Sequence, residues 1–343
     1  MTLQNIPLEA WMSLYDAAIR FEQTACWDWM YDDNIFGIQN PVTKEIGYAC
    51  VLGNAGEIYA LNVFLGADGF SVYMKMLREN VDEYSYHNIM YEQHCLQAAF
   101  LSRQELSDED LKIIKKLGLR FRGANAWPQF RNYSPCYYPW YLEQREIEYL
   151  TVALEQTIEV SLRCRSNPDI LISPGGSGYL TRMANTEGDK IVWKDEYRKP
   201  PLEEIKVVPG METEDIRIHR IRKNNFKRQG IWEAEMFFYP NPVREKKDRP
   251  YFPRLFFIMD EATQMVLTTN LFTPDNNMIG IRNTFLDFIE NCGVIPTEVR
   301  AKNQIIIDLL KPLGELLQFN LVAKKQLPGA ELFQKSMYED MRD

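Results

Sequence analysis

Three acidic residues in the second half of the chain, Glu235, Asp260 and Asp287, are of the type that holds divalent metal ions. Clustered carboxylates of this kind position the two cations used in phosphoryl transfer. The same residues also suit a solvent-facing strand, a hairpin turn and the polar face of a helix. Because a metal site needs three or more convergent ligands, we expect no metal or cofactor. We expect Mg²⁺ or Mn²⁺ to bind only under the alternative hypothesis, in which these three acids converge to form a metal site.

Other residues that could carry chemistry are sparse. His87, His94 and Cys95 form the one local group of transition-metal ligands, whereas a structural zinc site uses four. With three histidines in the chain, few bases are present to activate a nucleophile. The glycine-rich loop at 175–178 lacks the Lys-Ser/Thr pair of a phosphate-binding loop. We therefore predict no metal site and no nucleophile–histidine pair.

A run of basic residues stands out against the acidic average of the chain. Residues 217–249 carry ten basic and four acidic side chains, whereas the whole chain has a net charge of −9. This basic strip predicts contact with a polyanion, with Phe226 and Trp232 available to stack on bases. A solvated surface, or a dock for an acidic protein surface, is the competing interpretation. The residues predicted to bind the polyanion are Arg217, Arg220, Arg222, Lys223, Lys227 and Arg228.

Composition narrows the class of protein. The chain has 343 residues, of which 45% are hydrophobic and 25% charged, which is typical of a globular protein with two domains. The six cysteines have no paired spacing, so we expect reduced thiols and a cytoplasmic location. No apolar run is long enough to span a membrane, and the first residues lack the pattern of a signal peptide.

Two segments of the chain follow the same pattern of strands. The segments that start at Ile35 and Ala234 each contain Asn-Pro-Val, a connection, an apolar strand, a polar turn and a third strand. Each segment is followed by patterns of helix, strand, helix, strand and helix. In the first half, the two later strands are expected at 92–101 and 119–122. Residues 205–208 and 216–222 alternate and are predicted as additional strands. An internal duplication is therefore expected.

This element order resembles the ribonuclease H-like fold of transposase and integrase cores. Trp232-Glu233-Ala234-Glu235 stands where those cores carry Trp-x-x-Asp, and the segment 253–271 stands where they carry an apolar hairpin with an Asp. The strand that begins at Pro296 would present a second acid at its end, but Lys302 and Asn303 occupy that place. The resemblance therefore implies the fold without its catalytic acids. The whole chain also resembles an uncharacterised bacterial family built from two domains of unknown function.

We therefore predict an α/β protein with two duplicated ribonuclease H-like modules (βββαβαβα), each a mixed sheet flanked by helices. The first is expected at 1–165, a linker with a hairpin insertion at 166–204, and the second at 205–343. The expected function is that of a non-catalytic binding or scaffold protein with an unknown protein partner, and nucleic acid is a second candidate partner. The alternative is a metal-dependent nuclease or transposase-like enzyme. Aromatic residues at 127–141 could line a partner groove or fill the core.

Overall fold

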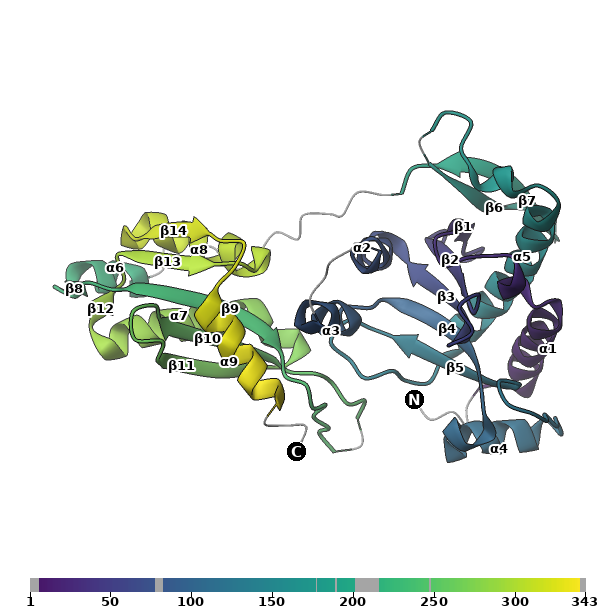
Figure 1. Cartoon of the computed structure of the whole chain (residues 1–343), viewed down its shortest axis with the longest axis horizontal. Helices are drawn as coiled ribbons and strands as arrows, with labels where there is room; N and C mark the ends of the chain where they lie inside the picture. Colours follow the sequence, from purple (N-terminus) through teal and green to yellow (C-terminus); the bar gives the residue numbers. More distant parts are fainter. Residues whose placement is uncertain are drawn as a thin grey trace. The chain divides into compact units, whose positions relative to one another are not determined.

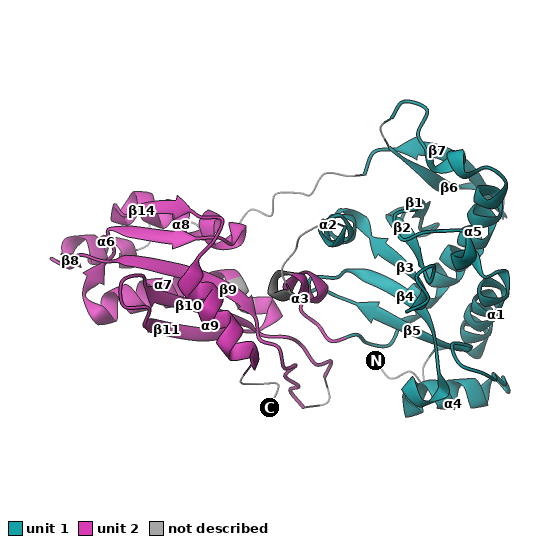
Figure 2. Ribbon diagram, in the orientation of Figure 1, with its two compact units in different colours: residues 1–82, 92–135, 139–204 teal, residues 83–91, 136–138, 205–343 magenta. Residues whose placement is uncertain are grey.

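The computed structural model describes residues 6–77, 83–176, 178–188, 190–200, 216–246 and 248–339. The chain forms two compact units. Figure 1 colours the chain along its sequence, and Figure 2 colours it by unit. Unit 1 comprises residues 1–82, 92–135 and 139–204, and unit 2 comprises residues 83–91, 136–138 and 205–343. Unit 2 thus includes two short segments from the first half of the chain.

Unit 1 is built on a seven-stranded sheet with the order β5-β4-β3-β2-β1-β6-β7. Neighbouring strands are antiparallel except β1 and β6, which are parallel. The sheet is therefore a five-stranded meander with a hairpin added beside its first strand. The strands are β1 (Phe36–Gln39), β2 (Ile46–Leu52), β3 (Tyr59–Leu65), β4 (Cys95–Leu101), β5 (Trp127–Tyr133), β6 (Tyr179–Glu187) and β7 (Lys190–Arg198).

Helices cover both faces of this sheet, because its central strands are apolar on both sides. The larger core lies under α1 (Leu8–Thr24) and α5 (Gln144–Ser166), whose inward residues pack against Val51, Leu61 and Val63. The smaller core lies under α2 (Gly66–Met76) and contains Tyr48, Cys50, Phe64, Phe70 and Tyr73. The short helix α4 (Asp108–Lys116) begins with a capping box formed by Ser107 and Asp110.

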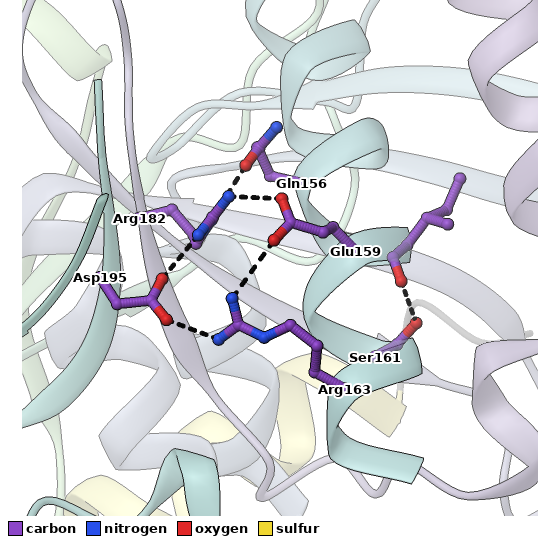
Figure 3. A network of polar contacts seen from close by, with 7 residues as sticks. Gln156, Glu159, Ser161, Arg163, Arg182 and Asp195 are labelled. Carbon is purple, nitrogen blue, oxygen red and sulfur yellow. Dashed lines mark hydrogen bonds and ion pairs between the residues drawn. The ribbon is translucent and has the colours of Figure 1, made fainter. Parts of the chain in front are cut away.

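A polar network attaches the β6–β7 hairpin to α5 (Figure 3). Arg182 on β6 is 6% exposed. Its guanidinium donates to Gln156 Oε1 at 3.0 Å, to Asp195 Oδ1 at 2.6 Å and to Glu159. Arg163 completes the ring by donating to Asp195 Oδ2 at 2.6 Å and Glu159 Oε1 at 3.2 Å. The buried cation is thus neutralised by two carboxylates, so the hairpin is an integral part of unit 1.

Unit 2 is built on a five-stranded sheet with the order β11-β10-β9-β13-β14. β9, β10 and β11 are antiparallel, whereas β13 is parallel to β9 and β14 is parallel to β13. A parallel strand needs a crossover connection, and α7 and α8 supply those crossovers. The strands are β9 (Ile231–Phe238), β10 (Arg254–Asp260), β11 (Val266–Phe272), β13 (Glu298–Ala301) and β14 (Asn320–Ala323), and a separate ladder pairs β8 (Lys227–Arg228) with β12 (Val294–Ile295).

The two faces of this sheet are covered differently. On one face, Trp232, Ala234 and Met236 of β9 pack in a core with residues of α6, α7 and α8. On the other face, Phe237, Leu255 and Phe257 pack against α9. The alternation of β9 therefore places Glu233 and Glu235 on the α9 face. The helices of unit 2 are α3 (Glu83–Tyr91), α6 (Ile216–Lys223), α7 (Asn277–Cys292), α8 (Gln304–Leu317) and α9 (Pro328–Glu339).

Two expected strands are wrong. Residues 119–122 form no strand, and the fifth strand is instead β5, which includes part of the aromatic segment. Residues 216–223 form helix α6, because Ile218 and Ile221, three positions apart, are both buried. The expected strand at 205–208 lies outside the described residues.

A mixed α/β architecture with helices on the sheet faces is present in both units, but their strand orders differ. In unit 1 the strands after β3 are antiparallel and lie beside it, whereas in unit 2 the later strands are parallel and lie beside β9. The shared strand order expected of an internal duplication is therefore not confirmed.

Candidate functional site

The β9–β13 junction on the α9 face of unit 2 is the place where the strands gather charged side chains. β9 contributes Glu233 and Glu235, and the parallel strand β13 contributes Glu298 and Arg300, with Arg300 in register with Glu233. Lys302 follows β13. Alternate residues of a strand point to the same face of the sheet, and residues in register on neighbouring strands point to the same face. The strand geometry therefore brings these side chains together.

Glu235 is held by the main chain at the end of β13. Its Oε2 accepts hydrogen bonds from the N–H groups of Lys302 at 3.0 Å and Asn303 at 3.1 Å. Its Oε1 accepts from the N–H of Met236 at 2.9 Å. Asn303 is itself the N-cap of α8, since its side chain accepts from Ile305 N–H at 2.9 Å. Glu235 therefore anchors the chain where it enters α8.

Glu233 has a similar role at a second helix. It is 3% exposed, and its Oε2 accepts from the N–H of Ala330 at 3.1 Å in the first turn of α9. A carboxylate at this place satisfies a free helix donor and complements the helix dipole. A Cβ at the neighbouring Gly329 would lie 2.0 Å from Gln264 Oε1, so a larger residue there would displace the Gln264 side chain.

The cations of the site are paired with other carboxylates. The Arg300 guanidinium contacts Glu298 at 2.7 Å and Glu261 at 2.9 Å. The Lys302 ammonium contacts Glu331 of α9 at 3.2 Å. The hydrogen bond from Arg300 lowers the pKa of Glu298. The site is thus a set of neutralising pairs along the β9–β13 ladder.

Burial sets the protonation of the two β9 acids. It raises the pKa of Glu235 to about 7, although the three N–H donors oppose that shift. Burial likewise raises the pKa of Glu233, against the N–H of Ala330. Glu235 can therefore exchange a proton near neutral pH. Its two oxygens already accept three hydrogen bonds, which limits their availability as metal ligands.

The other two acids from the sequence lie elsewhere in unit 2. Asp260 ends β10, and its Oδ1 accepts from the main-chain N–H of Thr263 at 2.9 Å and from its hydroxyl at 2.8 Å, which is a turn. Asp287 lies on α7, on the opposite face of the sheet from Glu235, and contacts Arg217. Among the described residues, no three His, Cys, Asp or Glu side chains are grouped so that they could hold a metal ion.

The basic strip divides into paired and exposed cations. Arg217 and Arg220 of α6 both contact Glu290 of α7, and Arg217 also contacts Asp287. Arg228 donates to the carbonyl oxygens of Leu317 and Gln318 at 2.9 Å, at the end of α8. Of the six residues predicted to bind a polyanion, the other three are exposed and make no ion pair with the described part of the chain: Arg222, Lys223 and Lys227.

Sequence reasoning identified Glu235 and its neighbours Lys302 and Asn303, but it missed Glu233, Arg300 and Glu331. The spacing of Glu233 and Glu235 is the signal for a shared face. Glu331 carried no such signal, because its approach to Lys302 depends on how α9 crosses the sheet.

Two family models match the chain, each described as a domain of unknown function. The first, DUF7309, matches residues 11–182, and the second, DUF6930, matches residues 217–338. No curated protein matches the chain. No helix in the described part is long and apolar enough to cross a membrane. Since the first model matches half of the chain, the protein belongs to the family of the domain of unknown function DUF7309.

Proposed function

We propose that this protein is a non-catalytic binding or scaffold protein, and that unit 2 is a ribonuclease H-like module whose acidic site holds helices in place of metal ions. The strand order β11-β10-β9-β13-β14, with β13 and β14 parallel to β9, supports the resemblance of unit 2 to that fold. We do not extend the resemblance to unit 1, whose strand order differs.

The observation that carries the proposal is the use of Glu235. It stands on the first strand of the sheet, where a ribonuclease H-like enzyme would have its first metal-binding acid. Its oxygens accept hydrogen bonds from three main-chain N–H groups. Two of these belong to Lys302 and Asn303, where the second acid would stand. A metal ion would have to displace these bonds beside the Lys302 ammonium, which disfavours a cation.

Metal titration tests this proposal against the nuclease alternative. We expect the full chain to give only heats of dilution with Mn²⁺ in isothermal titration calorimetry, and no cleavage of DNA or RNA. Saturable Mn²⁺ binding that disappears in Glu235→Gln but persists in Glu109→Gln, a control acid of unit 1, would revive the enzyme. Cleavage activity with the same pattern would do so more strongly.

The binding role needs a positive test as well. A partner captured by the tagged full chain from its native cell should be purified and titrated back against the chain. We expect Glu235→Gln to bind that partner as the wild type does, provided that its circular dichroism is native. A partner that is turned over, or whose binding requires Mn²⁺, would contradict a non-catalytic role.

Nucleic acid is the second candidate partner, because Arg222, Lys223 and Lys227 are exposed without ion pairs in the described part of unit 2. We expect weak binding of a DNA or RNA oligonucleotide that declines with salt, since each neutralised phosphate releases counterions. Alanine at all three positions should abolish it, whereas alanine at the exposed cations Lys115, Lys116 and Arg120 of unit 1 should not. Absence of binding at low salt removes this candidate.

A further inference from the structure

The outer strands of the two sheets differ in how they are protected from pairing with other chains. An edge strand exposes a row of main-chain N–H and C=O groups, which can template a strand of another molecule. Proteins usually prevent this with charged side chains, proline, short strands or a covering segment. Three of the four outer strands show such protection.

In unit 1, β7 carries five charged residues among its nine, and β5 contains Pro128 and is partly covered. The cover is a reciprocal pair of main-chain hydrogen bonds between Asn132 and Trp140, at 2.7 and 2.9 Å. In unit 2, β14 has four residues, and Lys324 and Lys325 follow it. Each of these edges therefore resists the addition of a strand.

β11 has little of this protection. Its seven residues, Val-Leu-Thr-Thr-Asn-Leu-Phe, include no charge and no proline. A register shift against β10 leaves Leu267 unpaired near the start of the strand, and the pairing is regular from Thr268 to Phe272. Thr269, Asn270 and Leu271 are exposed, Leu271 by 49%. Within the described residues, β10 is the only strand that pairs with β11 (Figure 1).

We propose that β11 pairs antiparallel with β11 of a second copy of this chain, about a two-fold axis near Thr269, so that two unit 2 sheets form one continuous sheet. The proposal is independent of the metal question, because β11 lies two strands away from β9.

The absence of charge favours a second copy as the occupant. In an antiparallel pair related by a two-fold axis, the central residue faces its own equivalent in the second copy. Each of the remaining residues faces another β11 residue of that copy. A charged edge would therefore often place like charges opposite each other, which destabilises the pair. β11 avoids this conflict in every register, because none of its residues is charged. Pairing would also shield part of the exposed Leu271 side chain from water.

Sedimentation velocity over a range of concentrations tests the proposal with the full chain. We expect a monomer–dimer equilibrium that Thr269→Lys weakens by about threefold to fivefold, because two lysines would meet near the axis. The matched control is Thr186→Lys, the same exchange at an exposed position on β6 of unit 1, and it should leave the equilibrium unchanged. A wild type that stays monomeric, or equal dimerisation of wild type and Thr269→Lys, overturns the proposal.

A cross-link gives a second readout if Thr269→Lys fails to fold. Cys292 is the one exposed cysteine, so Cys292→Ser provides the background. Directly opposite residues in an antiparallel pair have Cα atoms about 4.5–5.5 Å apart, within reach of a disulfide. We expect Thr269→Cys to form a covalent dimer on oxidation, and Thr186→Cys to remain monomeric. Equal yields at the two positions, or no dimer at position 269, contradict the pairing.

Discussion

In both units the first strand of the sheet has one antiparallel and one parallel neighbour, but the first strands differ in polarity. In unit 1, β1 runs Phe-Gly-Ile-Gln and contains no acid, and its partner β6 carries the buried Arg182. In unit 2, β9 carries Glu233 and Glu235 beside β13. Unit 1 thus buries a cation that fixes a hairpin, whereas unit 2 buries carboxylates that fix helix starts. The pair of parallel strands that includes the first strand therefore carries a structural charge of opposite sign in the two units.

The largest effect is expected from Arg182→Ala in unit 1. It removes a buried guanidinium that bonds Gln156, Glu159 and Asp195. We expect a loss of about 2–4 kcal/mol in the free energy of unfolding, because three hydrogen bonds from a charged group and the packing of the buried side chain are lost. Denaturant unfolding followed by fluorescence should show the shift. Arg198→Ala, which breaks only the exposed pair with Glu196, is the control and should change little.

The second effect is a difference in pH dependence between the units. The pKa of Glu235 is raised by burial from an ordinary value of 4.5 to about 7. The folded state therefore binds the proton more tightly than the unfolded state, and unit 2 loses stability as pH rises from about 4.5 to 7. Glu235→Gln should flatten this slope, which we expect to amount to about 1–3 kcal/mol at most. Urea unfolding at several pH values measures it.

Asp195 in unit 1 provides the opposite sign. Burial would raise its pKa, but the hydrogen bonds from Arg163 and Arg182 outweigh burial and lower it. Its contribution to stability is therefore present above the pKa of an unfolded aspartate and is lost as pH falls through the lowered value. Asp195→Asn should make unit 1 less sensitive to acid. An identical pH slope in wild type and both variants would refute the contrast between the units.

A smaller loss of stability, of equal size in the two units, is expected when the N-cap residue of one helix in each unit is replaced. The Ser107 hydroxyl accepts from Asp110 N–H at 3.3 Å at the start of α4, and Asn303 accepts from Ile305 N–H at 2.9 Å at the start of α8. Alanine at either position should cost about 1 kcal/mol. A much larger loss at Asn303 would show that the Glu235 contacts depend on that cap. Thermal unfolding of the two variants makes the comparison.

The smallest effect is expected at exposed ion pairs on helices. Lys112 contacts Glu109 on α4, and Lys335 contacts Glu339 on α9. Alanine at either lysine should leave the unfolding midpoint within error of wild type, because solvent screens such pairs. A clear loss at Lys335 alone would indicate that α9 is less stably docked than α4.

Sequence alone determined most of the elements, because their signals are local. The apolar runs of β2, β3, β9 and β10 correspond to observed elements. Local patterns were ambiguous at α6, where Ile216 and Ile218 alternate as in a strand while Ile218 and Ile221 have helical spacing. They also did not reveal strand β5, whose aromatic residues were interpreted as the lining of a partner groove or as core.

Tertiary structure alone decided which strands are neighbours and which polar groups meet. The pairing of β4 with β3 in unit 1, and of β13 with β9 in unit 2, depends on contacts between distant residues that local periodicity does not encode. For the same reason the sequence identified Glu235 as a candidate site residue but did not reveal its hydrogen-bond partners. The carboxylate meets the N–H groups of residues 302 and 303, 67 and 68 positions away, only because β9 and β13 are adjacent.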